Sequence, residues 1–216
     1  TQYTYENDSF GNTYDENAMV TAADYDALAK AVKSGGLIKL GADVDARAPL
    51  TFGGDAHLDL AGKTLKNTSD IWGDNDWSLI SAQNGVDVVI DGNGTVKAKE
   101  NDCYAVDVQD GSAVTIKNGT FVGNIHAVYV YEGTAIIEGG TYSVQQKYSD
   151  ASKADEFVLN CYDENRKNGT AKIIVKGGTF INFNPADCQA EGEHTNFVAD
   201  GYSVVSETKA NGDVWY

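Results

Sequence analysis

A recurring set of aromatic, amide and acidic side chains is the part of this sequence best suited to binding. The set consists of Asp107, Gln109, Tyr129, Tyr131, Asn160 and Tyr162. Tyrosine rings stack on sugar rings, and amide or carboxylate groups hydrogen-bond to sugar hydroxyls. Tyrosine is also enriched in protein interfaces, and it favours β-strands in general. The set therefore predicts a binding face for a glycan or a protein, with plain strand decoration as the alternative.

The densest group of acids lies in the segment Asp70-Ile-Trp-Gly-Asp-Asn-Asp76. Asp70, Asp74 and Asp76 place closely spaced oxygens in a glycine-containing loop, and Ca²⁺ prefers oxygen ligands. The spacing differs from that of an EF-hand, and a solvated acidic loop explains the same residues. We therefore expect neither a metal nor a cofactor. If the protein did bind Ca²⁺, these three residues would be the candidate ligands.

The paired carboxylates of a glycoside hydrolase are not evident in the recurring set. Such enzymes hold two carboxylates roughly 5–9 Å apart across a groove, whereas the outward positions contain Asp107 as their carboxylate. Other acids recur beside predicted turns, where Asp is favoured. They are Asp110, Glu132, Asp163 and Asp200. We assign no catalytic residue, and the sequence favours a protein without enzymatic activity.

A phrase of about twenty residues recurs along the chain, and this repeat predicts where these side chains lie in the fold. The phrase Tyr104-Ala-Val-Asp-Val-Gln-Asp-Gly111 matches His126-Ala-Val-Tyr-Val-Tyr-Glu-Gly133. Each copy continues into a short apolar strand and then a Gly-Thr-aromatic motif, which ends at Phe121 and Tyr142. Self-similarity of this kind, with short strands and glycine corners, predicts a β-solenoid.

The alternation of side chains along a strand sorts the repeats into inward columns. The first strands supply two columns. One column is Ile80, Val106, Val128 and Leu159, and the other is Ala82, Val108, Val130, Cys161 and Val198. The second strands supply Val88 and Ile90, Val114 and Ile116, Ala135 and Ile137, and Ile173 and Val175. The third strands supply Leu65, Val96, Phe121, Tyr142 and Phe180. We expect coils of three strands, stacked in parallel at about 4.8 Å, and roughly six coils in total.

The chain divides into three predicted parts. Residues 1–20 are polar and acidic and form an arm that is either disordered or ordered on a partner. Residues 21–36 form a helix, opened by Thr21-Ala-Ala-Asp24, that caps the first coil. Residues 37–216 form the β-helix and end in a β-hairpin with a turn at Asn211-Gly212.

The composition limits the partners of the protein. The 216 residues carry a net charge of −16, which repels phosphate backbones and anionic lipids, so we expect neither nucleic acid nor a membrane as partner. Three cysteines leave one unpaired and fit assembly in the cytosol. The chain begins at Thr1 rather than Met, which leaves open whether a signal peptide was removed.

Over residues 21–216 the chain resembles the right-handed parallel β-helix superfamily, which has the pectin-lyase-like fold. The resemblance rests on the helix before the repeats, the strands at residues 37–44 and the phrase Val-x-Ile-x-x-Gly-Thr-Phe. Residues 177–185 and 196–204 are similar to the ends of β-helical proteins from gut bacteria and their phages. The resemblance implies an all-β fold, a single-stranded right-handed parallel β-helix.

Members of this superfamily include polysaccharide lyases and hydrolases, phage tailspikes and fibres, and non-catalytic surface proteins. A lyase would place an Arg or Lys base beside calcium-binding carboxylates, but neither Arg47 nor Arg166 lies beside an acidic column. The resemblance is closest to non-catalytic phage appendages and bacterial surface members. It implies a structural virion protein, namely a head-fibre, decoration or tail-fibre component at the virion surface.

The same resemblance implies the partners. The N-terminal arm would bind capsid or tail proteins, the outward face would contact a host surface glycan, and the protein would form a homo-oligomer, with a trimer as one form. The alternatives are a polysaccharide lyase or glycoside hydrolase, or a bacterial surface adhesin, in a secreted or cell-surface setting.

Overall fold

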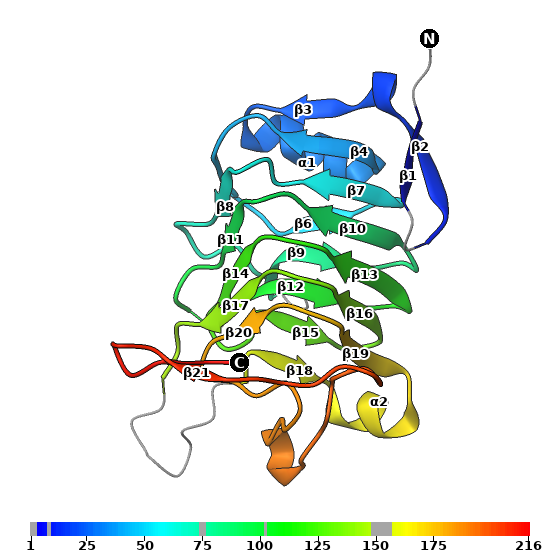
Figure 1. Cartoon of the computed structure of the whole chain (residues 1–216). Helices are drawn as coiled ribbons and strands as arrows, with labels where there is room; N and C mark the ends of the chain where they lie inside the picture. Colours follow the sequence, from blue (N-terminus) through cyan, green and yellow to red (C-terminus); the bar gives the residue numbers. More distant parts are fainter. Residues whose placement is uncertain (1–3, 8–9, 74–76, 102, 148–156) are drawn as a thin grey trace.

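The computed structural model describes residues 4–7, 10–73, 77–101, 103–147 and 157–216 (Figure 1). Three parallel sheets wind around one apolar core in this part of the chain. Successive strands of the chain pass from one sheet to the next and then return beside their predecessors. The protein is thus a parallel β-solenoid, as the repeats predict.

Each sheet is built from equivalent strands of successive coils. Sheet 1 contains β6(Leu50–Phe52), β9(Ser78–Ala82), β12(Tyr104–Val108), β15(Val128–Val130) and β18(Leu159–Cys161). Sheet 2 contains β3(Val20–Ala22), β4(Gly36–Leu40), β7(Ala56–Asp59), β10(Asp87–Asp91), β13(Ser112–Ile116), β16(Gly133–Ile137) and β19(Ala171–Val175). Sheet 3 contains β5(Val44–Asp45), β8(Thr64–Lys66), β11(Thr95–Lys97), β14(Thr120–Gly123), β17(Thr141–Val144) and β20(Thr179–Phe180).

The register between strands confirms the predicted columns. Val106 lies opposite both Ile80 and Val128 in sheet 1, and Val128 lies opposite Leu159. The second column of this sheet runs through Val108 in the same way. These side chains are at most 1% exposed, so the columns form the core of the solenoid.

Val198 does not belong to the column in which the sequence places it. It forms a parallel bridge with Val175 and therefore joins sheet 2 rather than sheet 1. After β20 the chain makes a loop in which Cys188 pairs with Thr195, instead of a further strand of sheet 1. The chain consequently reaches the edge of sheet 2 directly, and its last half-copy of the repeat is displaced by one sheet.

An aromatic stack fills the core beside sheet 3. Tyr142 lies between Phe121 and Phe180, with ring centroids 5.3 and 5.0 Å apart and interplanar angles of 13°. The buried hydroxyl of Tyr142 donates to the carbonyl oxygen of Gly139 at 2.7 Å. Offset stacking of this kind contributes about 1 kcal/mol per pair beyond the burial of area.

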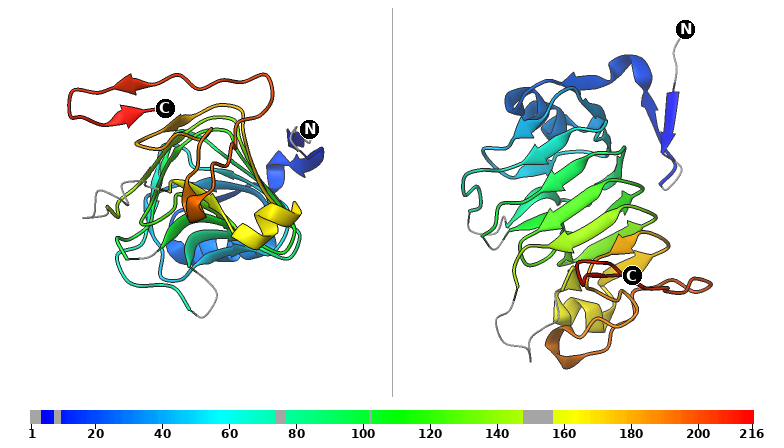
Figure 2. Two further views of the ribbon diagram at one scale, coloured as in Figure 1. Left: turned by 90° about the horizontal axis from the view of Figure 1, so that it is seen from below. Right: turned by 60° about the vertical axis from the view of Figure 1, so that its left-hand side comes forward.

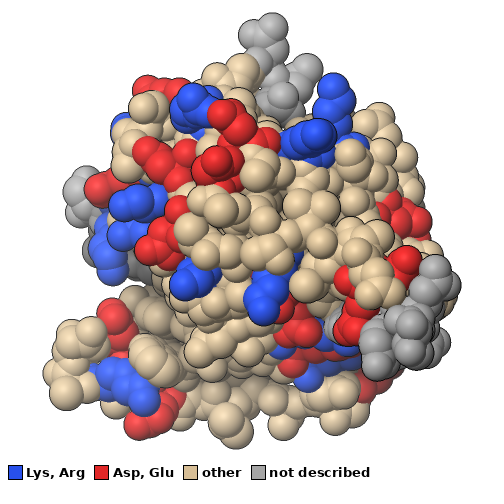
Figure 3. Space-filling model, turned by 90° about the horizontal axis from the view of Figure 1, so that it is seen from above, with Lys and Arg blue, Asp and Glu red and all other residues tan. Residues whose placement is uncertain are grey.

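Helix α1(Tyr25–Ser34) begins one turn later than the sequence suggests. The carboxylate of Asp24 caps it by accepting the amide of Ala27 at 2.8 Å. Thr21 is not the cap, because it lies in β3 and pairs with Lys39 of β4. The buried face of the helix packs against β3, β4 and β6. Figure 3 looks onto this end of the solenoid, where acidic and basic side chains are interspersed.

The described part of the N-terminal arm has regular structure that the sequence does not reveal. Strands β1(Thr4–Asn7) and β2(Asn12–Asp15) form an antiparallel hairpin, and the 3-10 helix η1(Glu16–Ala18) follows. β3 then pairs in parallel with β4, so the solenoid begins before residue 21. Figure 2 shows the hairpin beside the body of the solenoid.

The C-terminal residues end sheet 3 with an antiparallel strand. β21(Glu207–Thr208) and β22(Val214–Trp215) form a hairpin around Asn211-Gly212. Tyr216 and Phe180 exchange two backbone hydrogen bonds, of 2.8 and 2.9 Å. Two short helices occupy loops nearby, α2(Asp163–Asn168) before β19 and η3(Ala190–Gly192) after β20. No helix of the described residues is long and apolar enough to cross a membrane.

We expect Val108→Asp or Val130→Asp to unfold the protein, because each buries a carboxylate without a partner in the central column. The loss in free energy of unfolding should be at least about 3 kcal/mol, measured by chemical denaturation. Lys172→Asp is the control, since it places the same group on an exposed position of β19. Similar stability of all three variants would contradict the column.

We expect Gly133→Ala to destabilise the protein more than Gly111→Ala does. Both glycines have positive φ angles, 135° and 72°, so both substitutions strain the backbone. A Cβ at Gly133 would meet the carbonyl oxygen of Ser112 in the preceding coil at 2.2 Å, whereas nothing lies within 4 Å at Gly111. The difference should be about 1–3 kcal/mol in thermal or chemical unfolding. Equal losses would argue against close contact of the coils at this corner.

Candidate functional site

The register of sheet 1 determines where the recurring polar and aromatic set lies. Asp107 lies opposite Tyr129, and Tyr129 lies opposite Asn160, on β12, β15 and β18. Their neighbours Val106, Val108, Val128 and Val130 point inward and are buried. Gln109, Tyr131 and Tyr162 follow the ends of the same three strands.

A groove lies on this outer face of sheet 1. Its volume is about 540 Å³. The residues that line it are Trp77, Gln83, Tyr104, Asp107, Gln109, Asp110, Tyr129 and Tyr131. Asp107, Gln109, Tyr129 and Tyr131 are therefore brought together, whereas Asn160 and Tyr162 lie outside the lining.

Aromatic rings occupy one side of the groove. Tyr129 stacks on Tyr104 with centroids 4.9 Å apart, and His126 lies 5.3 Å from Tyr129 and 5.2 Å from Tyr104. Desolvation by burial raises the pKa of Tyr129 above its usual value, so its hydroxyl stays neutral at physiological pH. Tyr131 stacks on Tyr162 at 4.9 Å, while it remains 45% exposed.

Trp77, Gln83 and Tyr104 line the groove, although the repeat pattern does not predict them there. Tyr104 has the parity of inward Val106, but it is the first residue of its strand and turns toward Tyr129. His126 is the equivalent residue in the next repeat, where the aligned phrases place it beside Tyr104. Aromatic residues at the start of a strand, or within two residues before it, were thus the available signal, and Trp77 directly before β9 shares it.

A polar network forms the floor of the groove. Asp107 is only 3% exposed, and its Oδ2 accepts hydrogen bonds from Gln109 Nε2 at 2.5 Å and from Ser81 Oγ at 3.3 Å. Gln83 Nε2 donates to Ser81 Oγ at 3.0 Å. The network holds both amide groups in place beside the aromatic side chains. It can therefore present donors and acceptors in fixed positions to a bound molecule.

The second carboxylate of the groove has a role in a turn. Asp110 has a φ of 57°, and its Oδ2 accepts the amide of Asn84 at 3.1 Å. Asp residues tolerate this left-handed conformation and often accept hydrogen bonds from nearby amides. The contacts of both groove carboxylates are thus those of structural acceptors.

Both arginines lie outside the groove lining, and so does Asp87. Arg47 pairs with Asp26, and Arg166 pairs with Asp163 at 2.6 Å. Desolvation by burial, assisted by the charge of Asp55, raises the pKa of Asp87. Both arginines are thus held in ion pairs away from the groove lining.

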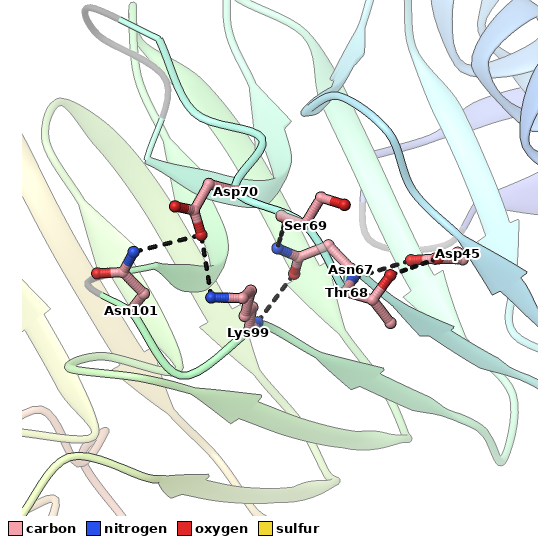
Figure 4. A network of polar contacts seen from close by, with 7 residues as sticks. All are labelled: Asp45, Asn67, Thr68, Ser69, Asp70, Lys99 and Asn101. Carbon is pink, nitrogen blue, oxygen red and sulfur yellow. Dashed lines mark hydrogen bonds and ion pairs between the residues drawn. The ribbon is translucent and has the colours of Figure 1, made fainter.

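The calcium candidate is described only at Asp70. Asp74 and Asp76 lie outside the described residues. Asp70 Oδ1 lies 3.0 Å from Lys99 Nζ and accepts Asn101 Nδ2 at 3.3 Å (Figure 4). The hydrogen bond from Lys99, followed by that from Asn101, lowers the pKa of Asp70. In the described ranges no cluster of three or more His, Cys, Asp or Glu residues could hold a metal ion.

Most of the other contacts in Figure 4 join successive coils. Buried Asn67 accepts the backbone amide of Lys99 at 2.9 Å and donates to the carbonyl oxygen of Ser69 at 2.9 Å. Thr68 donates to Asp45 through both its amide and its hydroxyl, at 2.9 and 2.7 Å. This network stabilises the corner after sheet 3 and leaves its polar groups occupied by the protein itself.

No known family model, curated protein or solved structure matches this chain. The superfamily resemblance of the repeats therefore stays a prediction. The geometry of the groove is the remaining basis for a functional proposal.

We expect His126 to make the stability of the protein depend on pH. Burial lowers the pKa of its imidazole from 6.5 to about 4, and Nδ1 lies 2.6 Å from the carbonyl oxygen of Phe157. The unfolded state binds a proton below pH 6.5, whereas the folded state does so only near pH 4. This contribution to stability is therefore present above pH 6.5 and is lost as the pH falls toward 4.

His126→Phe tests this prediction, because it keeps a ring and removes the titrating group. Between pH 7 and pH 5 the wild-type protein should lose about 2 kcal/mol more in free energy of unfolding than the variant. Chemical denaturation at both pH values measures the difference. An identical pH dependence of the two proteins would show that His126 is not buried in its neutral form.

Proposed function

We propose that this chain is a non-catalytic β-helical surface protein that binds a neutral glycan through the groove of sheet 1. The observation that carries the proposal is the combination of aromatic rings and fixed polar groups in one groove of about 540 Å³. Trp77 and Tyr131 are 42% and 45% exposed there. Rings of this kind gain contact area when a sugar ring stacks on them.

The charges of the groove favour a neutral sugar over an acidic one. Asp107 and Asp110 both line it, and the chain carries a net charge of −16. A uronate or sialate would approach against this field, whereas the hydroxyls of neutral sugars can donate to carboxylate oxygens. Gln83 and Gln109 add amide groups that both donate and accept.

Catalysis is the less favoured function for this groove. A glycoside hydrolase requires one carboxyl group to act as an acid and a second to act as a base or nucleophile. Asp107 accepts from Gln109 and Ser81, and Asp110 accepts from a backbone amide. Both carboxylates are thus engaged as hydrogen-bond acceptors within the protein. The function that we propose requires no cofactor.

The biological setting that we propose is a bacteriophage virion, in which the chain is a head-fibre, decoration or tail-fibre component. Its partners would be capsid or tail proteins, contacted through the N-terminal arm, and a glycan of the host surface. A bacterial surface adhesin would use the same groove in a secreted or cell-surface setting. The observation that β1 and β2 form a separate hairpin supports an arm that is distinct from the solenoid.

The finer features of the fold belong to the same proposal. We infer a right-handed, single-stranded β-helix, with α1 as the cap of the first coil and the C-terminal hairpin as the closure of sheet 3. The packing of α1 on β4 and β6 supports the first cap, and the hydrogen bonds between Tyr216 and Phe180 support the second. A homo-oligomer, a trimer in particular, stays a prediction.

We expect Tyr131→Ala and Trp77→Ala each to weaken glycan binding about tenfold, because each removes an exposed stacking ring. A microarray of neutral, N-acetylated and acidic bacterial oligosaccharides would identify the ligand, and calorimetry would measure its affinity. Tyr202→Ala is the matched control, since Tyr202 is a 54% exposed tyrosine outside the groove. Failure to bind any oligosaccharide, or equal affinities of all variants, would refute the proposal.

Two further experiments separate the alternatives. Incubation of the bound oligosaccharide with the protein should release no product, whereas a lyase or hydrolase would shorten it. Mass spectrometry of purified virions should detect the chain if it is a phage component, and its recovery from bacterial envelopes instead would favour the adhesin.

A further inference from the structure

Two of the three cysteines lie in the core at the C-terminal end of the solenoid. Cys161 ends β18, and Cys188 lies in the loop between β20 and η3. Both belong to the apolar core, with 4% and 2% of their surfaces exposed. Ala82, Val108 and Val130 precede Cys161 in its column, so packing alone does not require sulfur at this position.

The open edge of β18 is the place where Cys188 meets the solenoid. β18 pairs with β15 on one side, and in the described chain no further strand of sheet 1 pairs with its other side. Val158 and Tyr162, which flank β18, both form hydrogen bonds with β15. Successive residues of a strand point their backbone groups to opposite edges, so those of Leu159 and Cys161 face the open edge. Sγ of Cys188 donates to the carbonyl oxygen of Leu159 there, at 3.7 Å.

The side chain of Cys161 faces the interior at this edge, as that of Leu159 does. Asn160 lies between them and opposite Tyr129 on the outer face, so its two neighbours point inward. Burial, and after it the thiol of Cys188, raises the pKa of Cys161 to about 12. The electrostatic effect of one thiol on another falls with distance, so it supports the proximity of the two sulfur atoms.

From these observations we propose that Cys161 and Cys188 form a disulfide bond when the protein is in an oxidising environment. Paired strands lie about 4.8 Å apart, and disulfides join Cα atoms that are roughly 4.4–6.8 Å apart. A residue held on the edge of β18 is thus within the range of a disulfide to that strand. The bond joins the last described strand of sheet 1 to the loop that lies against its open edge.

Cys103 is the cysteine that stays a thiol. It directly precedes Tyr104 of β12, whereas Cys161 belongs to β18, and β15 lies between these two strands. Sγ of Cys103 donates to the carbonyl oxygen of Tyr104 at 3.5 Å, and burial raises the pKa of this thiol to about 12. One disulfide and one thiol together account for the odd number of cysteines.

The oxidant for this bond is a small disulfide such as glutathione disulfide. The thiolate of one cysteine attacks it, forms a mixed disulfide and releases one glutathione. The second cysteine then attacks the protein sulfur of the mixed disulfide and releases the other glutathione. The two protein thiols lose two electrons and two protons, and the glutathione disulfide gains them. Because both thiols are buried, we expect the reaction to occur during folding, before the loop docks on β18.

The bond fits either location that we propose for the protein. Disulfides persist at virion and cell surfaces and are rare in the cytosol. The loop has weaker attachments of its own, because Cys188 and Thr195 exchange backbone hydrogen bonds of 2.8 and 2.9 Å, and exposed Lys167 lies 3.6 Å from Glu193. A covalent bond to β18 adds an attachment to the core and constrains the unfolded chain. The groove of sheet 1 includes neither cysteine, so the proposal is independent of glycan binding.

Refolding of the reduced, denatured chain in a buffer of reduced and oxidised glutathione tests the proposal. Alkylation of the refolded protein under denaturing conditions should then detect one thiol instead of three, and the mass before alkylation should be lower by two hydrogens. Peptide mapping should find Cys161 linked to Cys188. Cys103→Ala is the control, and it should form the same bond and retain no thiol.

Thermal unfolding with and without a phosphine reductant tests whether the folded structure accepts the bond. The oxidised wild-type protein should melt at least about 5 °C higher than the reduced protein, because the bond restricts the unfolded chain. Cys161→Val removes one partner and keeps the column apolar. The melting temperature of this variant should therefore be the same in both conditions.

The outcomes are decisive in each direction. Three alkylated thiols after refolding, a bond that includes Cys103, or a bond between two chains would overturn the proposal. An oxidised protein that melts at or below the temperature of the reduced protein would overturn it as well. A link between Cys161 and Cys188, with a rise in melting temperature that Cys161→Val lacks, would support it.

Discussion

Parallel hydrogen bonding in register between successive coils is the constraint on which this structure depends. Val106 lies opposite both Ile80 and Val128, so a strand residue of one coil lies beside its equivalents in the adjacent coils. Similar side chains thereby become neighbours. Stacked rings such as Phe121, Tyr142 and Phe180 gain from this arrangement. A buried charge without a partner, or a Cβ added at a tight corner, would instead destabilise the contacts with both adjacent coils.

The same constraint creates open edges where the stack ends, and the protein covers them with irregular elements. At the first coil, α1 packs on β4 and β6. At the last coil, residues 197–199 bond to Val175, and Tyr216 bonds to Phe180. The ends of the described stack are thus covered in three different ways, by a helix, by a single bridge and by an antiparallel strand.

The repeats predicted the interior of this protein far better than its ends. Alternation along a strand places Val108 and Val130 in one column, because burial of one face is a strong and periodic signal. Thr21 and Val198 were assigned wrongly, since the first and last coils depart from the repeat. The sequence grouped Asp107 with Tyr129, but it indicated neither the burial of Asp107, which contacts Ser81 and Gln109, nor the place of Trp77 in the groove lining.

The rise between coils also sets a length scale for recognition. Asp107, Tyr129 and Asn160 are successive members of one row, so neighbouring contacts on this face are separated by the spacing of hydrogen-bonded strands, about 4.8 Å. A polymer whose units recur at a multiple of that distance can repeat the same contact along the axis. A polymer whose repeat distance is not such a multiple would fall out of register with the row of side chains after one or two units. Duplication of a whole coil would then lengthen such a surface in fixed steps without altering its chemistry.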